Sequence, residues 1–217
     1  MKRIRIQYSK TEPLRYTGML DIQHLWERLF RRAHLDLAYS QGFHPQPRIQ
    51  QAAPLPLSFL SSCELLDFWL DGEVEISSIL DSIQRTSQPG LEIQHMEEVD
   101  LVTPPLQTIL ETATYVVVNL VENDSNQLKR NIAWILNEQT LFRERRNKTY
   151  DLRPLILDLK LSEPAGEKKQ IEMKLSAREA ATGRPDEVTA ALGYDPLDFR
   201  YLRSHLGFPS PIFSIDP

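Results

Sequence analysis

The sequence predicts an α+β protein built from two tandem ferredoxin-like units, each a βαββαβ arrangement with an antiparallel sheet. The main observation is that alternating polar–apolar stretches and amphipathic helical stretches follow the same order in both halves of the 217 residues. The second is a stretch around Pro104-Pro105, which is typical of a linker. We therefore divide the chain into a first unit at 1–100, a linker at 101–112 and a second unit at 113–217.

The first unit opens with a half-buried strand at 3–9, in which alternate residues are apolar. A helix over 22–35 follows, with either Asp21 or Thr17 as its N-cap. Helical spacing places one set of residues on its apolar face: Ile22, Leu25, Trp26, Leu29, Phe30 and Ala33. The rest of the unit is predicted as a short strand at 35–40, an extended segment at 48–57, a strand at 63–72, a helix at 75–87 and a strand at 91–99.

The second unit repeats this order of elements without repeating the sequence. Its elements are predicted as a strand at 114–121, a helix at 125–139, strand residues within 150–163, a strand at 170–177, a helix at 184–193 and a strand at 199–208. The short helix at 184–193 has Pro185 in its first turn and Gly193 after its end, which are favoured positions for these residues.

Composition narrows the class of protein. At 41% hydrophobic and 25% charged residues the chain is globular in character, and it has no apolar run that could span a membrane. The first ten residues lack the apolar core of a secretory signal, so we expect a cytoplasmic protein without a membrane partner. Cys63 is the single cysteine, which excludes a disulfide framework and multi-thiolate metal sites. We expect no metal and no cofactor.

Charge is unevenly distributed along the chain. Residues 1–60 carry nine basic and four acidic residues, a net charge of +5, whereas the whole chain has −5. Residues 61–127 carry thirteen acids and one arginine, a net charge of −12, which is typical of a solvated surface. The basic first quarter coincides with an unusual loop, and this combination favours an anionic partner there.

That loop reads AYSQGFHPQPRIQ, residues 38–50. Its glycine permits a positive φ, and its prolines restrict the backbone and so reduce the entropy lost on binding. Either Tyr39 and Phe43 belong to the core and the loop is a rigid connection, or the aromatic residues stack on RNA bases while arginines meet phosphates. The RNA-binding candidates here are Arg15, Arg31, Arg32, Tyr39, Gln41, Phe43, His44 and Arg48. For Arg31 and Arg32 alone, a solvated helix face is the competing interpretation.

A second basic cluster, RERRNKTYDLR, spans residues 143–153. It is either solvated surface or a hairpin-like arm that reaches nucleic acid. The candidates for RNA contact in it are Arg145, Arg146, Tyr150 and Arg153.

Several of these motifs resemble one known family, the radical-SAM-linked domain of unknown function, which is largely bacterial. That family occurs alone or joined to a cobalamin-type radical SAM protein. The matching residues are Tyr8-Ser9, Leu14-Arg15-Tyr16, Thr17 to Asp21, the Arg31-Arg32 helix, the loop from Tyr39 to Pro47, YDLRP at 150–154 and GRPDEV with a later LG within 183–193. The resemblance implies a radical SAM protein as partner. Since many such enzymes modify RNA, it also implies RNA as a further partner.

Two positions depart from the family pattern. Met19 stands where the family usually has a histidine, and His44-Pro45-Gln46-Pro47 replaces the usual Asn-Pro-His-Pro. The resemblance therefore does not imply a catalytic histidine at position 19 or in the segment 44–47.

Three functions remain open. The first is a non-catalytic, accessory RNA-binding or adaptor domain that works with a radical SAM enzyme in RNA modification or processing. The second is a metal-free ribonuclease that uses His44 as general acid–base. The third is a protein-interaction module that binds no nucleic acid.

Overall fold

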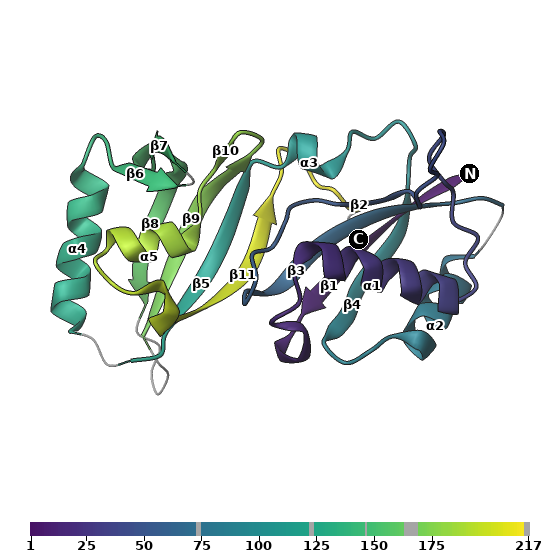
Figure 1. The fold of residues 1–217 in the computed structure, drawn as a ribbon, viewed down its shortest axis with the longest axis horizontal. Helices are drawn as coiled ribbons and strands as arrows, with labels where there is room; N and C mark the ends of the chain where they lie inside the picture. Colours follow the sequence, from purple (N-terminus) through teal and green to yellow (C-terminus); the bar gives the residue numbers. More distant parts are fainter. Residues whose placement is uncertain (73–74, 122–123, 146, 163–168, 215–217) are drawn as a thin grey trace. The chain divides into compact units, whose positions relative to one another are not determined.

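The computed structural model describes residues 1–217 except 73–74, 122–123, 146, 163–168 and 215–217 (Figure 1). The chain forms two compact units: Met1–Ile109 together with the C-terminal segment from Phe208 onwards, and Leu110–Gly207. The mixed α+β class and the antiparallel pairing expected from the sequence are confirmed. The expected division places the C-terminal segment in the second unit, whereas its contacts group it with the first.

The first unit has strands and helices in the predicted order, but its second strand lies in the segment predicted as extended at 48–57 and not at 35–40. Its main elements are β1 (Lys2–Lys10), α1 (Met19–Arg32), β2 (Ile49–Gln51), β3 (Leu60–Leu70), α2 (Ile76–Thr86) and β4 (Leu91–Val99). The short elements η1 (Glu12–Leu14) and α3 (Leu106–Ile109) complete it. The strands pair in the order β4-β1-β3-β2, with antiparallel neighbours throughout. Figure 1 shows α1 and α2 lying over these strands.

An aromatic cluster forms the centre of the core between the strands and the helices of the first unit. Trp26 of α1 makes an edge contact with Tyr8 of β1, with ring centroids 5.0 Å apart, and lies 5.2 Å from Phe30. Phe30 in turn stacks on Phe68 of β3 at 4.4 Å. These residues are almost completely buried, as the helical spacing of the apolar residues predicts.

The opposite face of β1 is also buried, which corrects the expectation of a half-buried strand. Arg3 and Arg5 lie on this face, and both side chains bind the carboxylate of Asp67 on β3. All three residues are at most 2% exposed. The remaining guanidinium donors reach backbone carbonyls of Thr103 and Pro104 before α3, and of Ile212 in the C-terminal segment. Asp67 and these carbonyls satisfy charges that would otherwise need water.

Two local predictions for the first unit are wrong. Residues 35–40 form no strand and make only single bridges, Leu37 to Leu70 and Tyr39 to Pro47, because the chain is already turning into the loop. Helix α1 begins at Met19 with Gly18 at the N-cap, so neither Asp21 nor Thr17 holds that position. Asp21 lies in the first turn instead, where its carboxylate accepts the Gly18 N–H at 3.1 Å.

The second unit follows the same succession with a hairpin added. Its elements are β5 (Thr112–Asn119), α4 (Ser125–Asn137), β6 (Phe142–Arg145), β7 (Lys148–Asp151), η2 (Arg153–Leu155), β8 (Ile156–Ser162), β9 (Gln170–Arg178), β10 (Ala181–Thr182), α5 (Pro185–Ala191), η3 (Pro196–Asp198) and β11 (Phe199–Gly207). Here β9 pairs with β8 and with β5, and β5 pairs with β11, all antiparallel. The hairpin β6–β7 pairs only with itself among the described residues.

Candidate functional site

The loop at 38–48 is a narrow hairpin anchored on β3. The Ala38 N–H donates to the Trp69 carbonyl at 2.8 Å, and the Arg48 N–H donates to the Ala38 carbonyl at 2.8 Å. Further out, the Ser40 N–H donates to the Gln46 carbonyl at 2.8 Å, and the Gln46 N–H returns to the Ser40 hydroxyl at 3.0 Å. Gly42 at the tip has a φ of 138°, a conformation that side-chain-bearing residues rarely adopt.

The aromatic residues of the hairpin loop point into solvent. Phe43 is fully exposed and Tyr39 is 51% exposed, so neither belongs to the core. This outcome disfavours the interpretation of the loop as a rigid connection over a sheet. Gln41 and His44 are exposed beside them. Phe43 therefore presents an exposed aromatic ring on a hairpin that backbone hydrogen bonds anchor to β3.

Arg48 lies at the base of the hairpin rather than at its tip. Its guanidinium stacks over the Trp69 ring at 4.5 Å from the centroid and donates to the Met1 sulfur at 3.2 Å. Arg3 lies 5.1 Å from the same ring. Stacking on Trp69 and the contact with Met1 therefore hold Arg48 at the base of the loop.

Much of the basic charge of residues 1–60 is used inside the protein. Arg3, Arg5 and Lys10 are buried, and Lys2 pairs with Glu98 at 3.0 Å. Arg15 donates to the Ser58 carbonyl at 3.3 Å and stacks over Tyr16 at 5.2 Å.

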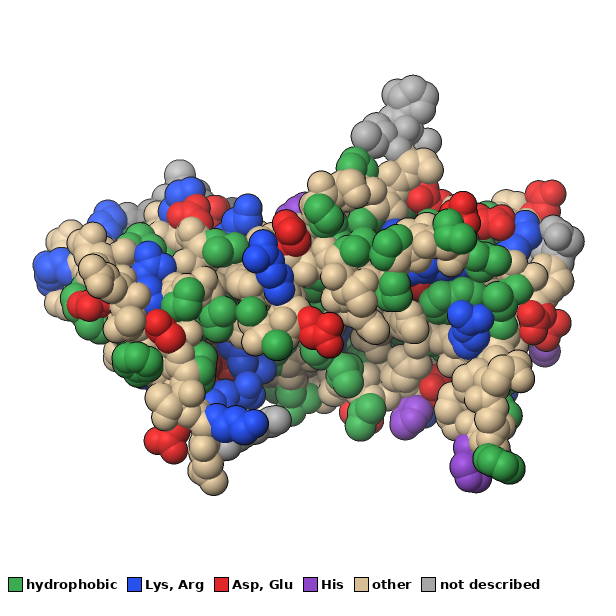
Figure 2. Space-filling view, turned by 90° about the horizontal axis from the view of Figure 1, so that it is seen from above, with side chains coloured by type: hydrophobic (Ala, Val, Ile, Leu, Met, Phe, Trp, Pro, Cys, Tyr) green, Lys and Arg blue, Asp and Glu red, His purple; other side chains and the backbone are tan. Residues whose placement is uncertain are grey.

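Arg31 and Arg32, in the last turn of α1, are exposed, and the structure describes no ion pair for either. On the face drawn in Figure 2, basic side chains stand among acidic ones rather than in one continuous patch.

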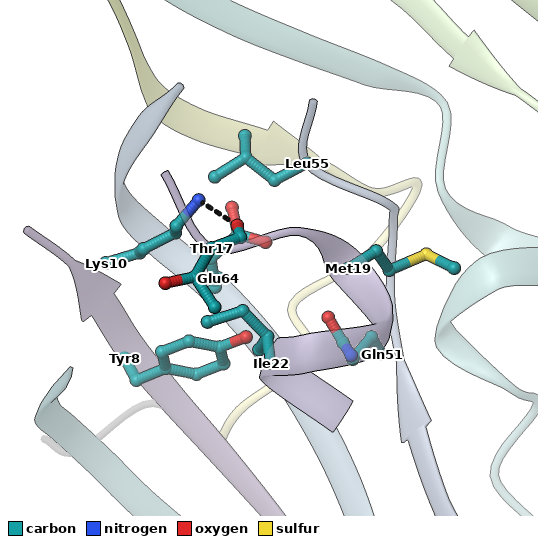
Figure 3. A pocket seen from close by; sticks show the side chains of 8 residues that line it. All are labelled: Tyr8, Lys10, Thr17, Met19, Ile22, Gln51, Leu55 and Glu64. Carbon is teal, nitrogen blue, oxygen red and sulfur yellow. Dashed lines mark hydrogen bonds between the residues drawn. The ribbon is translucent and has the colours of Figure 1, made fainter. Parts of the chain in front are cut away.

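A small pocket lies beside the start of α1 (Figure 3). Its volume is about 10 Å³, enough for one water molecule. The lining residues come from β1, α1, β2, β3 and the connecting segments: Tyr8, Lys10, Thr17, Met19, Ile22, Gln51, Leu55 and Glu64. Figure 3 shows the Lys10 amine directed at Thr17, whose carbonyl accepts its hydrogen bond at 2.9 Å.

The sequence reasoning did not select Lys10 and Glu64, which are 2% and 3% exposed. A signal was present, because each charged residue interrupts the pattern of a buried strand. Met19 lines the same pocket as Lys10 and Glu64. The cavity is too small for an organic ligand.

Most of the second basic cluster lies in the hairpin β6–β7, which agrees with the hairpin-like arm, one of the two interpretations of this cluster. Its arginines have different environments. Arg153 caps the end of α4, since its guanidinium donates to the carbonyls of Leu136, Glu138 and Ile156 at 3.0–3.1 Å. We therefore leave Arg153 out of any contact set. Arg145 is 37% exposed and lies near Glu187, Tyr150 is partly buried, and Arg146 lies outside the described residues.

Among the described residues, His44 is not part of an assembled catalytic centre. His44 has no hydrogen-bonding or ion-pair partner in the described part of the chain, so nothing there would orient its imidazole. The described residues also contain no cluster of His, Cys, Asp or Glu that could hold a metal ion. No helix among them is long and apolar enough to cross a membrane.

The fold and the site thus define an antiparallel α+β protein of two units that displays an aromatic hairpin. The chain belongs to a family described as an uncharacterized protein conserved in bacteria (DUF2344), whose model matches residues 3–185. No curated protein matches the chain.

Two solved structures show weak similarity. The acetolactate synthase small subunit from Thermotoga maritima is 11% identical, with 95% of each chain covered and a TM-score of 0.28. A putative Dyp-type peroxidase protein from Shewanella oneidensis is 9% identical, with 88% of this chain and 82% of that chain covered and a TM-score of 0.25. At these scores neither similarity supports an argument about function.

Proposed function

We propose that this protein is a non-catalytic RNA-binding adaptor built from two tandem ferredoxin-like units. Support for the fold comes from strand order. Numbered within each unit, the strands pair in the order 4-1-3-2, as β4-β1-β3-β2 and as β11-β5-β9-β8. This antiparallel order with two helices is the split βαβ arrangement.

The observation that carries the RNA-binding proposal is the fully exposed Phe43 at the tip of the hairpin loop. Tyr39 adds a second, half-exposed ring, and bases stack on such rings without sequence preference. Arg31 and Arg32 supply exposed cations at the end of α1 for phosphate contacts. A radical SAM protein is the partner that the resemblance of the sequence motifs favours.

Ribonuclease activity is the less supported alternative. A metal-free ribonuclease needs a general base held in a defined orientation, and the exposed His44 has no partner among the described residues that would hold it. We therefore assign His44 to binding.

The test measures fluorescence anisotropy of a short, labelled, single-stranded RNA of mixed sequence. Replacing Phe43 by Ala should weaken binding by about 1–3 kcal/mol, the usual contribution of one base–aromatic stack. Stability should change by less than about 0.5 kcal/mol, because Phe43 has no buried contacts to lose. Trp134→Ala, which removes a half-exposed ring from α4, is the control and should bind RNA normally.

Charge is tested separately. Arg31→Gln with Arg32→Gln should weaken binding and reduce its dependence on salt. RNA binding that is equal in the wild type and in Phe43→Ala would refute the stacking role. If the chain retains a radical SAM protein from native cells but no RNA, the adaptor part stands and the RNA part fails.

A further inference from the structure

Hairpin β6–β7 gathers its cations on one face. In its register Arg143 lies opposite Tyr150, and Arg145 lies opposite Lys148. Directly opposed residues share a face, as do residues two positions apart in one strand. The side chains of Arg143, Arg145, Lys148 and Tyr150 therefore project from the same side of the ribbon, which we call the basic ribbon face.

Glu187, in the first turn of α5, is the carboxylate that this face meets. Arg143 Nε lies 3.7 Å from one of its oxygens, and Arg145 Nε lies 3.7 Å from the other. Charge-assisted hydrogen bonds are about 2.7–2.9 Å long, so both pairs attract without being hydrogen bonded. No other acceptor meets either guanidinium in the described part of the chain, although the side chains are only 32% and 37% exposed.

The charges around Glu187 do not balance. The neighbouring Asp186 is already bound by Arg184 in a bidentate pair at 3.0 and 2.7 Å. Among the described residues, Glu187 is the carboxylate within ion-pair distance of Arg143 and Arg145, and the exposed Lys148 lies on the same face. The described side chains leave an excess of positive charge and unused, forked N–H donors, which suit a tetrahedral oxyanion.

Tyr150 supplies a neutral donor at the same place. Burial, and next the nearby Glu187 carboxylate, raise the pKa of its hydroxyl, whereas Arg143 and Arg145 act in the opposite direction. The hydroxyl therefore keeps its proton at neutral pH and can donate to an anion.

We propose that the basic ribbon face binds a phosphate group between Arg143 and Arg145, with Lys148 and Tyr150 as further donors. Glu187 holds the two guanidiniums in place and competes with the anion for them. The phosphate group belongs either to an RNA backbone or to a free phosphate. The site goes beyond the proposed role of the hairpin loop, because it uses other residues in the other unit.

The test titrates the full-length protein with inorganic phosphate and follows the arginine Nε–Hε signals by NMR, with sodium chloride at matched ionic strength as reference. The signals of Arg143 and Arg145 should shift with phosphate and stay in place with chloride. Arg143→Gln with Arg145→Gln should lower phosphate affinity about tenfold or more, the effect of losing charge-assisted hydrogen bonds. Arg130→Gln, which removes an exposed arginine from α4, is the matched control and should change nothing.

Glu187→Gln gives the sharper result, because it removes the competing charge while keeping the size of the side chain. It should raise phosphate affinity several-fold, a gain that misfolding cannot produce. Unchanged or weaker phosphate binding in Glu187→Gln would overturn the proposal, as would an absence of shifts at both arginines.

The same variants, tested with the labelled RNA, distinguish the two sources of phosphate. If Glu187→Gln raises the affinity for both phosphate and RNA, the site binds a phosphate of the RNA backbone. If the substitution raises the affinity for phosphate alone, the site binds free phosphate. A third outcome separates this site from the proposed function. If Phe43→Ala weakens RNA binding, while no ribbon variant changes RNA affinity and phosphate shifts no arginine signal, the proposed function stands and this site is overturned.

Discussion

Asp67 is one carboxylate that serves two buried guanidiniums. Arg5 lies directly opposite it in the strand register, and Arg3 reaches it from two positions along β1. Burying an ion pair of this kind costs desolvation free energy, yet removing one partner leaves a buried charge without a counter-charge. At the scale of single residues this makes Asp67 the most sensitive position of the first unit.

We expect Asp67→Asn to lower the free energy of unfolding by about 3–5 kcal/mol, since it keeps the shape but leaves both arginines without a counter-charge. Urea unfolding followed by circular dichroism measures the change. Glu98→Gln, which breaks the more exposed pair with Lys2, should cost less than about 1 kcal/mol. Equal effects of the two substitutions would contradict the role given to Asp67.

Tyr201 joins three elements of the second unit. It lies on β11, its hydroxyl is 2.7 Å from the Thr189 hydroxyl of α5, and it donates to the Pro196 carbonyl of η3 at 3.1 Å. Burial is the main reason that the pKa of Tyr201 is raised, because it disfavours the phenolate. The packing of α5 on this unit thus depends on a protonated tyrosine.

The folded protein keeps the Tyr201 proton at a pH where the unfolded chain loses it, near 10. The free energy of unfolding should therefore fall as the pH rises above about 10. Tyr201→Phe should flatten this alkaline decline and cost about 1 kcal/mol at neutral pH through the lost hydrogen bonds. Urea titrations at several pH values test both effects. Tyr16→Phe, at a 73% exposed position, is the control and should change neither the alkaline decline nor the stability at neutral pH. If stability still falls as steeply above about pH 10 in Tyr201→Phe as in the wild type, this account is wrong.

The chain passes between its two compact units twice, once after Ile109 and once after Gly207. The second passage returns the C-terminal segment to the first unit. There the Ile212 carbonyl accepts from Arg5 at 2.7 Å, the Ser214 N–H donates to the Glu97 carboxylate at 3.0 Å, and Phe213 makes an edge contact with His95. A groove of about 410 Å³ remains between this segment, the end of β4 and the residues before α3.

At the scale of the whole molecule, we expect a chain that ends at Gly207 to be less stable by about 1–3 kcal/mol, because Arg5 loses a buried acceptor. A chain that ends at Ser214 keeps these contacts and serves as the control. Urea unfolding compares the two with the full-length protein. Should the shorter chain be as stable as the control, the C-terminal segment would not be part of the first unit's structure.

The sequence by itself determined the mixed α+β class of the fold and its longer helices and strands, because alternation and helical periodicity are local properties of these elements. It did not predict the short elements α3, β6 and β10. Strand β4 has the predicted bounds, and the hairpin β6–β7 agrees with one of the two interpretations of the basic cluster at 143–153. The sequence also located the loop with Phe43, since glycine and clustered prolines disfavour helix and favour turns locally.

Only the tertiary structure decided which charged residues are available for binding. Arg5 meets an acceptor 207 residues away, Arg153 is used to cap α4, and Arg143 and Arg145 share a glutamate from α5. These pairings follow from long-range packing, and no local pattern encodes them. For the same reason, burial of Lys10 and exposure of Phe43 became known only once the whole chain was folded.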